Sequence, residues 1–182
     1  MKKINLVKWF LILFLILPVG CDDSTSEPFS FSFNSDNSTT YDNSVTLGLG
    51  DVTDDVIIID VKANEITNGG VYCVYFDLSY ENYYLRFAGF EQGDFLEQGG
   101  SVNYQVGLDS SDSDVLVCAA SLVGQSETVT GSGTILSLKF EPLRTGITRF
   151  KFDNYQMLGI EYTGGSVITG ISWYGATLQV SK

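Results

Sequence analysis

The sequence GVYCVYFDLSYENYYLRFAGFEQGDFL, residues 70–96, decides the fold. From Tyr72 to Tyr80, a large apolar or aromatic residue occupies every second position, which is the period of a β-strand with one buried side. Ser-Tyr-Glu-Asn at residues 79–82 is typical of a turn. A second strand-like run follows it and ends at Gly93-Asp94. The stretch therefore predicts a strand, a corner and a second strand of a β-sandwich.

The rest of the chain extends the same pattern. At 182 residues the protein is long enough for one domain with a proper core and too short for two large ones. Glycine-rich turns separate short apolar runs, and no window has apolar residues at helical spacing. We therefore predict an all-β sandwich with strands at 45–49, 56–63, 71–79, 84–92, 102–108, 115–123, 134–141, 148–152 and 171–180.

The first 20 residues are typical of an export signal. Lys2, Lys3 and Lys8 precede an apolar run at residues 9–19. As a helix, that run would be about 17 Å long, well short of the roughly 30 Å hydrocarbon core of a bilayer. We therefore predict a signal peptide at residues 1–20, and not a membrane span.

The end of this segment resembles the lipobox of bacterial lipoproteins. It reads Leu17-Pro18-Val19-Gly20-Cys21, with proline where the family usually has leucine. The resemblance implies that Cys21 is diacylated and becomes the mature N-terminus. The chain is then an exported bacterial lipoprotein anchored to the cell envelope, either in the periplasm or on the cell surface. Ordinary secretion and an uncleaved anchor are the alternatives.

Residues 21–40 are mostly serine, aspartate, asparagine and threonine, which predicts a flexible tether before a domain at 41–182. One feature of the tether departs from this composition. Phe29, Phe31 and Phe33 alternate with serines, as they would in an edge strand. The tether is therefore shorter than its composition implies if these phenylalanines join the sheet.

Charge and composition exclude several functions. The chain has net charge −12, and removal of residues 1–20 takes away three lysines and no acid, which leaves −15. Such a protein repels nucleic acid and anionic lipid, so we expect membrane attachment only through the lipid. Without a histidine, Ser-His-Asp and Cys-His catalysis and most zinc sites are excluded.

The acidic residues do not indicate an active site. With 22 acids, accidental carboxylate pairs are too common to predict a glycosidase. Asp109-Ser-Ser-Asp-Ser-Asp114 has the alternating oxygens that suit calcium, but it lacks the glycine and closing glutamate of an EF-hand. A solvated turn is favoured. We predict no catalytic residue, no metal site and no cofactor.

Several motifs together resemble the cohesin module. Phe76-Asp77-Leu78-Ser79-Tyr80-Glu81-Asn82, followed by Leu85, is similar to the cohesin motif DFxLxYDPxVL, and the next strand ends in the family's Gly-Asp. Residues 131–140, GSGTILSLKF, resemble a Gly-x-Gly strand of the family. Gly146-Ile147-Thr148 resembles its Gly-x-Thr strand start. The resemblance covers about residues 41–180.

The resemblance implies a nine-stranded flattened jelly roll, a fold related to some carbohydrate-binding modules, and a flat face that binds a partner protein. In cellulosomal cohesins that partner is dockerin. We predict that the outward residues of two motif strands line this face: Tyr75, Asp77, Ser79, Ser137, Lys139 and Glu141. The known dockerin-binding residues do not carry over. Cys73 and Tyr75 replace an Asn and an Asp, and about Leu122 replaces a Glu.

Cys73 and Cys118 are the two cysteines left after Cys21. An even count in an exported protein suggests a disulfide, and the resemblance places their strands side by side. The two side chains are expected on opposite sides of the sheet, however, because Cys73 points outward and the resemblance puts Cys118 inward. A bulge would bring the sulfurs together. We predict the disulfide, with two packed thiols as the alternative.

These observations predict a non-catalytic envelope lipoprotein whose domain binds another protein, either dockerin-like or another envelope or extracellular protein. A carbohydrate-binding module is the first alternative, because aromatic side chains stack on sugars. Its platform would come from Tyr75, Tyr83, Tyr84, Tyr104, Trp173 and Tyr174. A structural lipoprotein that only assembles with other envelope proteins is the second.

Overall fold

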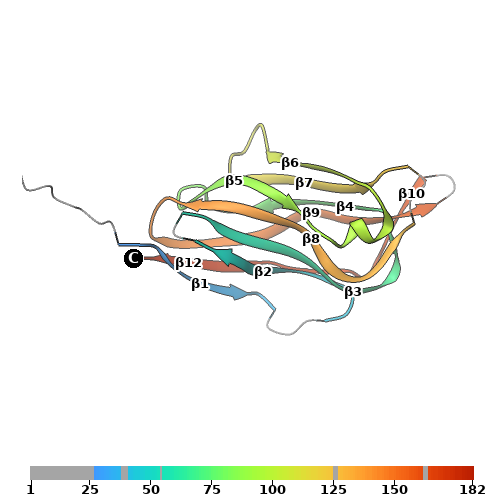
Figure 1. Ribbon diagram of the computed structural model, residues 1–182, viewed down its shortest axis with the longest axis horizontal. Coiled ribbons are helices and arrows are strands. Elements are labelled where there is room, and N and C mark those ends of the chain that lie inside the picture. Colours follow the sequence, from blue (N-terminus) through green and yellow to red (C-terminus); the bar gives the residue numbers. More distant parts are fainter. Residues whose placement is uncertain (1–26, 38–40, 54, 125–126, 162–163) are drawn as a thin grey trace, which may run out of the picture.

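The protein is a β-sandwich with one apolar core between two sheets (Figure 1). The computed structural model describes residues 27–37, 41–53, 55–124, 127–161 and 164–182. These residues form twelve strands and one 3-10 helix: β1 (Ser30–Ser35), β2 (Ser44–Val52), β3 (Ile57–Val71), β4 (Cys73–Ser79), β5 (Leu85–Gln92), η1 (Leu96–Gly99), β6 (Val102–Leu108), β7 (Val115–Leu122), β8 (Val129–Pro142), β9 (Gly146–Glu161), β10 (Gly164–Val167), β11 (Ser172–Tyr174) and β12 (Ala176–Ser181). The predicted all-β sandwich is confirmed.

The strands divide into a seven-stranded and a five-stranded sheet. The first has the order β1-β12-β9-β4-β7-β6, with β10 paired to the end of β9, and the second has the order β11-β2-β3-β8-β5. The described residues thus contain three strands more than the nine predicted. β1 and β10 are additions, and the strand predicted at 171–180 is divided at Gly175 into β11 and β12. These two halves pair with opposite sheets.

The stretch at residues 70–96 forms the predicted strand, corner and strand. Val74, Phe76, Leu78 and Tyr80 are all buried. The corner carries the chain from β4 in one sheet to β5 in the other. The Glu81 carbonyl accepts a hydrogen bond from the Tyr84 N–H at 3.1 Å, and the Glu81 side chain accepts bonds from the Thr148 hydroxyl and the Arg149 N–H. The corner is therefore tied to β9.

Aromatic rings join the two sheets at one end of the core. Phe140 of β8 lies 5.3 Å from Phe150 of β9 and 5.1 Å from Tyr80, measured between ring centroids. Leu136, Leu138 and Phe140 face inward as predicted, and all three are fully buried. Period-two alternation therefore identifies the buried side of both motif strands correctly.

The predicted tether at 21–40 is wrong over residues 30–35. This segment forms β1, which pairs antiparallel with β12 from Ser30 opposite Ser181 to Ser35 opposite Ala176. Phe29, Phe31 and Phe33 pack against the core, and their burial outweighs the serine-rich composition. Figure 1 shows the start of β1 beside the end of β12.

The predicted signal peptide and Cys21 lie outside the described residues. Within the described part of the chain, no helix is long and apolar enough to cross a bilayer.

The predicted disulfide is wrong, because the two thiols lie on opposite sides of one sheet. β4 and β7 pair without a bulge, so that Cys73 is opposite Ser121 and Cys118 is opposite Phe76. Cys118 is fully buried in the core, whereas Cys73 is half-buried on the outer side, and both are free thiols. Burial raises the pKa of both thiols above their ordinary value.

Candidate functional site

The six residues predicted to share one face lie on two different faces. Tyr75, Asp77 and Ser79 belong to β4, in the seven-stranded sheet, and Ser137, Lys139 and Glu141 belong to β8, in the five-stranded sheet. We call the outer surface of β9-β4-β7-β6 the β4 face and the outer surface of β11-β2-β3-β8-β5 the β8 face. Because the sheets pack with their inner surfaces together, the two faces point in opposite directions.

The centre of the β4 face consists of small or uncharged side chains. Across β4 and β7, Cys73 is opposite Ser121, Tyr75 is opposite Ala119 and Asp77 is opposite Val117. The edge strand β6 continues these rows with Asn103, Gln105 and Gly107. Asp77 is the only charged residue among these nine positions. A surface of this composition suits contact with a protein, because little charge has to be desolvated.

A hydrogen-bonded group fixes Asp77 beside this centre. The Tyr75 hydroxyl donates to Asp77 Oδ1 at 2.9 Å, and Asn154 Nδ2 donates to Asp77 Oδ2 at 2.7 Å. Asn154 reaches Asp77 because β9 has one extra residue between the positions opposite Tyr75 and Asp77. Asn154 has φ +46°, a left-handed conformation that asparagine tolerates better than most residues. The hydrogen bond to Asp77 raises the pKa of Tyr75 above its usual value.

A hollow of about 560 Å³ adjoins this group. Its walls come from β4, β5, β6 and β7 and include Tyr75, Gly107, Val117 and Ala119. No atom lies within 4 Å of the position that a Cβ on Gly107 would occupy, so the hollow is open above this residue. Asn154, Gly107 and the hollow were not predicted from the sequence, because each depends on the register between strands that are distant in sequence.

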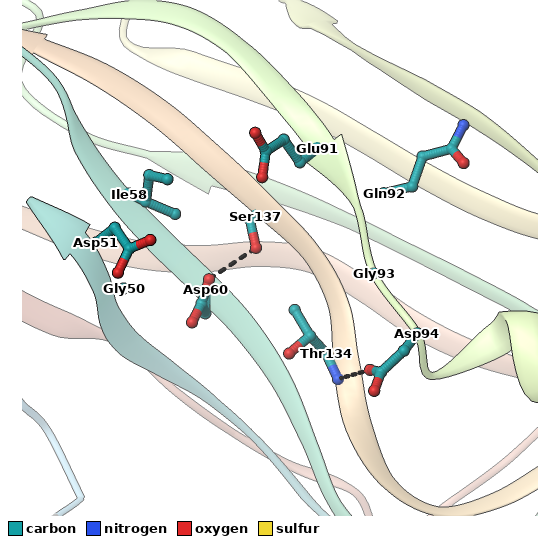
Figure 2. A pocket seen from close by; sticks show the side chains of 10 residues that line it. All are labelled: Gly50, Asp51, Ile58, Asp60, Glu91, Gln92, Gly93, Asp94, Thr134 and Ser137. Carbon is teal, nitrogen blue, oxygen red and sulfur yellow. Dashed lines mark hydrogen bonds between the residues drawn. The ribbon is translucent and has the colours of Figure 1, made fainter.

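A second hollow, of about 400 Å³, lies on the β8 face and contains four acidic side chains (Figure 2). Most of these acids already have partners. Asp60 Oδ1 accepts from the Ser137 hydroxyl at 2.7 Å and Asp60 pairs with Lys62, Glu91 pairs with Lys139 at 2.6 Å, and Asp94 Oδ1 accepts from the Thr134 N–H. Apart from the Asp60–Lys62 pair, which lies within β3, these bonds link β8 to β3, to β5 and to the segment after β5. Asp60, Glu91 and Asp94 are therefore accounted for by their structural contacts within the sheet.

The acidic segment 109–114 forms a turn between β6 and β7. Asp109 Oδ1 accepts from the N–H and the hydroxyl of Ser111, and Asp114 Oδ1 accepts from the Asn82 N–H at 3.0 Å. The bonds from Ser111 hold the pKa of Asp109 below its ordinary value. Among the described residues, no three histidine, cysteine or acidic side chains are placed to hold a metal ion. The carboxylates of Asp109 and Asp114 thus accept hydrogen bonds that stabilise this turn.

The aromatic residues predicted to form a sugar platform are not in one row. Tyr83 and Tyr84 lie in the corner with their rings nearly perpendicular, at 85°. Tyr104 directs its hydroxyl to the Gly93 carbonyl at 2.9 Å, and Trp173 packs against the core residues Phe76 and Phe152. The other two, Tyr75 and Tyr174, lie on different sheets, on β4 and β11. A coplanar set of exposed rings is therefore not formed by these six residues.

Solved structures with the same arrangement of strands are cohesin modules. The seventh ScaB type I cohesin from Pseudobacteroides cellulosolvens is 16% identical over 72% of this chain and 87% of its own, with a TM-score of 0.56. The domain has the cohesin fold. A non-cellulosomal cohesin from the archaeon Archaeoglobus fulgidus is 17% identical over 67% and 78% of the two chains, with a TM-score of 0.50.

A third structure with the cohesin fold contains a partner. It is the Coh-OlpA-Doc918 cohesin-dockerin complex from Clostridium thermocellum, which is 16% identical over 74% of this chain and 97% of that one, with a TM-score of 0.53. The sequence matches no family model, and no curated protein matches it either. At these identities the likeness establishes the cohesin fold alone.

Proposed function

We propose that this protein is an exported, lipid-anchored module that binds another protein through the β4 face. The observation that carries the proposal is the composition of that face. Small and uncharged side chains occupy its centre, and an apolar hollow opens beside Tyr75. The cohesin fold adds support, since a cohesin with this fold has been solved with dockerin bound. We expect a binding module and no catalysis.

The β8 face is less suited to a partner. Its central side chains are engaged in ion pairs between Asp60 and Lys62, Lys139 and Glu91, and Arg86 and Glu141. A partner that covered this face would remove water from these charged groups. The free-energy cost of that desolvation can exceed the attraction within the pairs. Among the described residues of the β4 face there is one such pair, between Lys151 and Asp153 on β9, at one side of the uncharged positions of β7 and β6.

Photo-crosslinking tests which face binds. A benzoylphenylalanine replaces Ala119 at the centre of the β4 face, or Ser137 at the centre of the β8 face, and native cells are irradiated. Both side chains are half-buried and outward, so the two variants are matched. We expect a crosslinked protein from position 119 and none from position 137. Equal yields, or crosslinks from position 137 alone, would refute the assignment. Crosslinks to polysaccharide alone would favour a glycan ligand.

Lipid attachment at Cys21 rests on its similarity to a lipobox and on the apolar run before it. Two or more acyl chains are enough to hold a protein stably on a bilayer. The intact mass of the protein from native cells is the test. We expect a chain that begins at Cys21 with acyl groups added, without the loss of two hydrogens that a disulfide between Cys73 and Cys118 would cause. A mass without acyl groups would exclude the anchor.

A further inference from the structure

Asp77 is a buried carboxylate that forms no ion pair with any described residue. Its side chain belongs to the β4 face but the residue is only 8% exposed. The five ion pairs of the described residues all use other acids. Lys151, which projects from the neighbouring strand β9, is bonded to Asp153 at 2.7 Å. Within the part of the chain that the structure describes, the bonds that compensate the Asp77 carboxylate are therefore those from Tyr75 and Asn154.

These two bonds leave the carboxylate with spare capacity. A carboxylate offers about four lone-pair positions to hydrogen-bond donors, and Asp77 uses one on each oxygen. Both donors are neutral, and the cation on the neighbouring strand, Lys151, is already bonded to Asp153, the residue opposite Asp77. Burial without a cation is costly for a carboxylate. A donor that brings a positive charge would be favoured at this position.

The hollow on the β4 face adjoins the hydrogen-bonded group that holds this carboxylate. Val117, one of its walls, is the residue directly opposite Asp77, and Tyr75, another wall, donates to Asp77. The lining is apolar at Val117 and Ala119. The negative charge of Asp109 raises the pKa of Tyr75 further, after the larger effect of the hydrogen bond to Asp77. An apolar wall and a carboxylate thus lie next to each other, joined through Tyr75, and this pair suits a side chain that has an aliphatic stem and a cationic head.

We propose that the partner protein anchors itself by a lysine or arginine whose stem lies along Tyr75, Val117 and Ala119 and whose cation meets Asp77. The inference rests on the proposed function, because it names the residue that the β4 face selects in its partner. The net charge of −12 also favours a basic partner, because attraction between opposite charges speeds the association of two proteins. Asp77 is then the specificity-determining residue of the face.

A displayed peptide library tests this choice. The target is the exported chain, residues 21–182 with Cys21→Ser, and the probe is a library of random 12-residue peptides. We retain only the peptides that bind the parent protein and do not bind its Gly107→Leu variant. In that variant the leucine side chain fills the hollow, and its Cβ meets no neighbouring atom. Among these peptides, we expect lysine or arginine to be enriched at one fixed position relative to the unselected library.

A substitution at Asp77 then tests whether its carboxylate recognises the basic side chain of the peptide. Asp77→Asn keeps the shape of the side chain and is expected to weaken the consensus peptide by roughly 30-fold. Changing the basic residue of the peptide to methionine should cause little further loss in that variant. Asp60→Asn removes one charge from the β8 face and is expected to leave affinity unchanged. Circular dichroism and the midpoint of thermal unfolding report whether each variant is folded.

The possible failures are distinguishable. Peptides that bind the β4 face without a fixed basic residue, or that bind Asp77→Asn as tightly as the parent, overturn the inference and leave the proposed function standing. A folded Asp77→Asn variant that loses neutral and basic peptides equally also overturns it. If no selected peptide depends on Gly107, both the inference and the proposed function are contradicted.

Discussion

Replacing Phe140 by alanine is expected to lower the free energy of unfolding by about 3–5 kcal/mol, the usual cost of removing a buried phenylalanine. Phe140 is fully buried, and its ring contacts those of Tyr80, Phe87 and Phe150. Aromatic pairs of this kind contribute about 0.5–1.5 kcal/mol beyond the area that they bury. Because Phe140 and Phe150 come from opposite sheets, the loss weakens the contact that joins the sandwich.

The expected loss is a large part of the about 5–15 kcal/mol that stabilises a typical domain. Urea unfolding followed by tryptophan fluorescence measures it. Tyr83→Ala is the matched control, because Tyr83 is aromatic but 59% exposed and contacts only Tyr84 and Arg144 among the ring and cation contacts found. We expect about 1 kcal/mol or less for the control. Equal losses in the two variants would show that Phe140 is not central to the core.

Local patterns in the sequence were enough to identify most of the strands and the buried sides of the two motif strands. Val74, Phe76 and Leu78 are buried as predicted because alternation is a property of one strand and needs no knowledge of its neighbours. The corner after Tyr80 was predictable for the same reason. β1 was partly visible in the alternation of Phe29, Phe31 and Phe33, although the serine-rich composition favoured a tether.

Properties that depend on pairing between distant strands were not predictable from local patterns. Tyr75 and Ser137 were predicted to share one face, whereas their strands, β4 and β8, belong to different sheets. Cys73 and Cys118 have opposite phase on paired strands, and a bulge that would have aligned them does not occur between β4 and β7. The bulge lies instead between β4 and β9, where it brings Asn154 to Asp77.

The largest effect on binding is expected from Ala119→Arg. Ala119 lies between Tyr75 of β4 and Gln105 of β6, at the centre of the β4 face. An arginine there would hold the partner away from the small residues around it. It would also bring a positive charge beside Asp77, where the partner's own cation is expected to bind. The few residues that dominate binding cluster near the centre of an interface, and their substitution changes affinity by about 2 kcal/mol or more, which is about 30-fold. We expect roughly 100-fold here because contact and charge are both disturbed.

The dissociation constant of the partner found by crosslinking, measured for three forms of the protein, tests binding through the β4 face most directly. The forms are the unmodified protein, Ala119→Arg and the matched variant Ser137→Arg at the centre of the β8 face. We predict roughly 100-fold weaker binding for Ala119→Arg and an unchanged constant for Ser137→Arg, with all three folded by circular dichroism. An unchanged constant for Ala119→Arg, or an equal loss in both variants, would contradict the assignment of the β4 face.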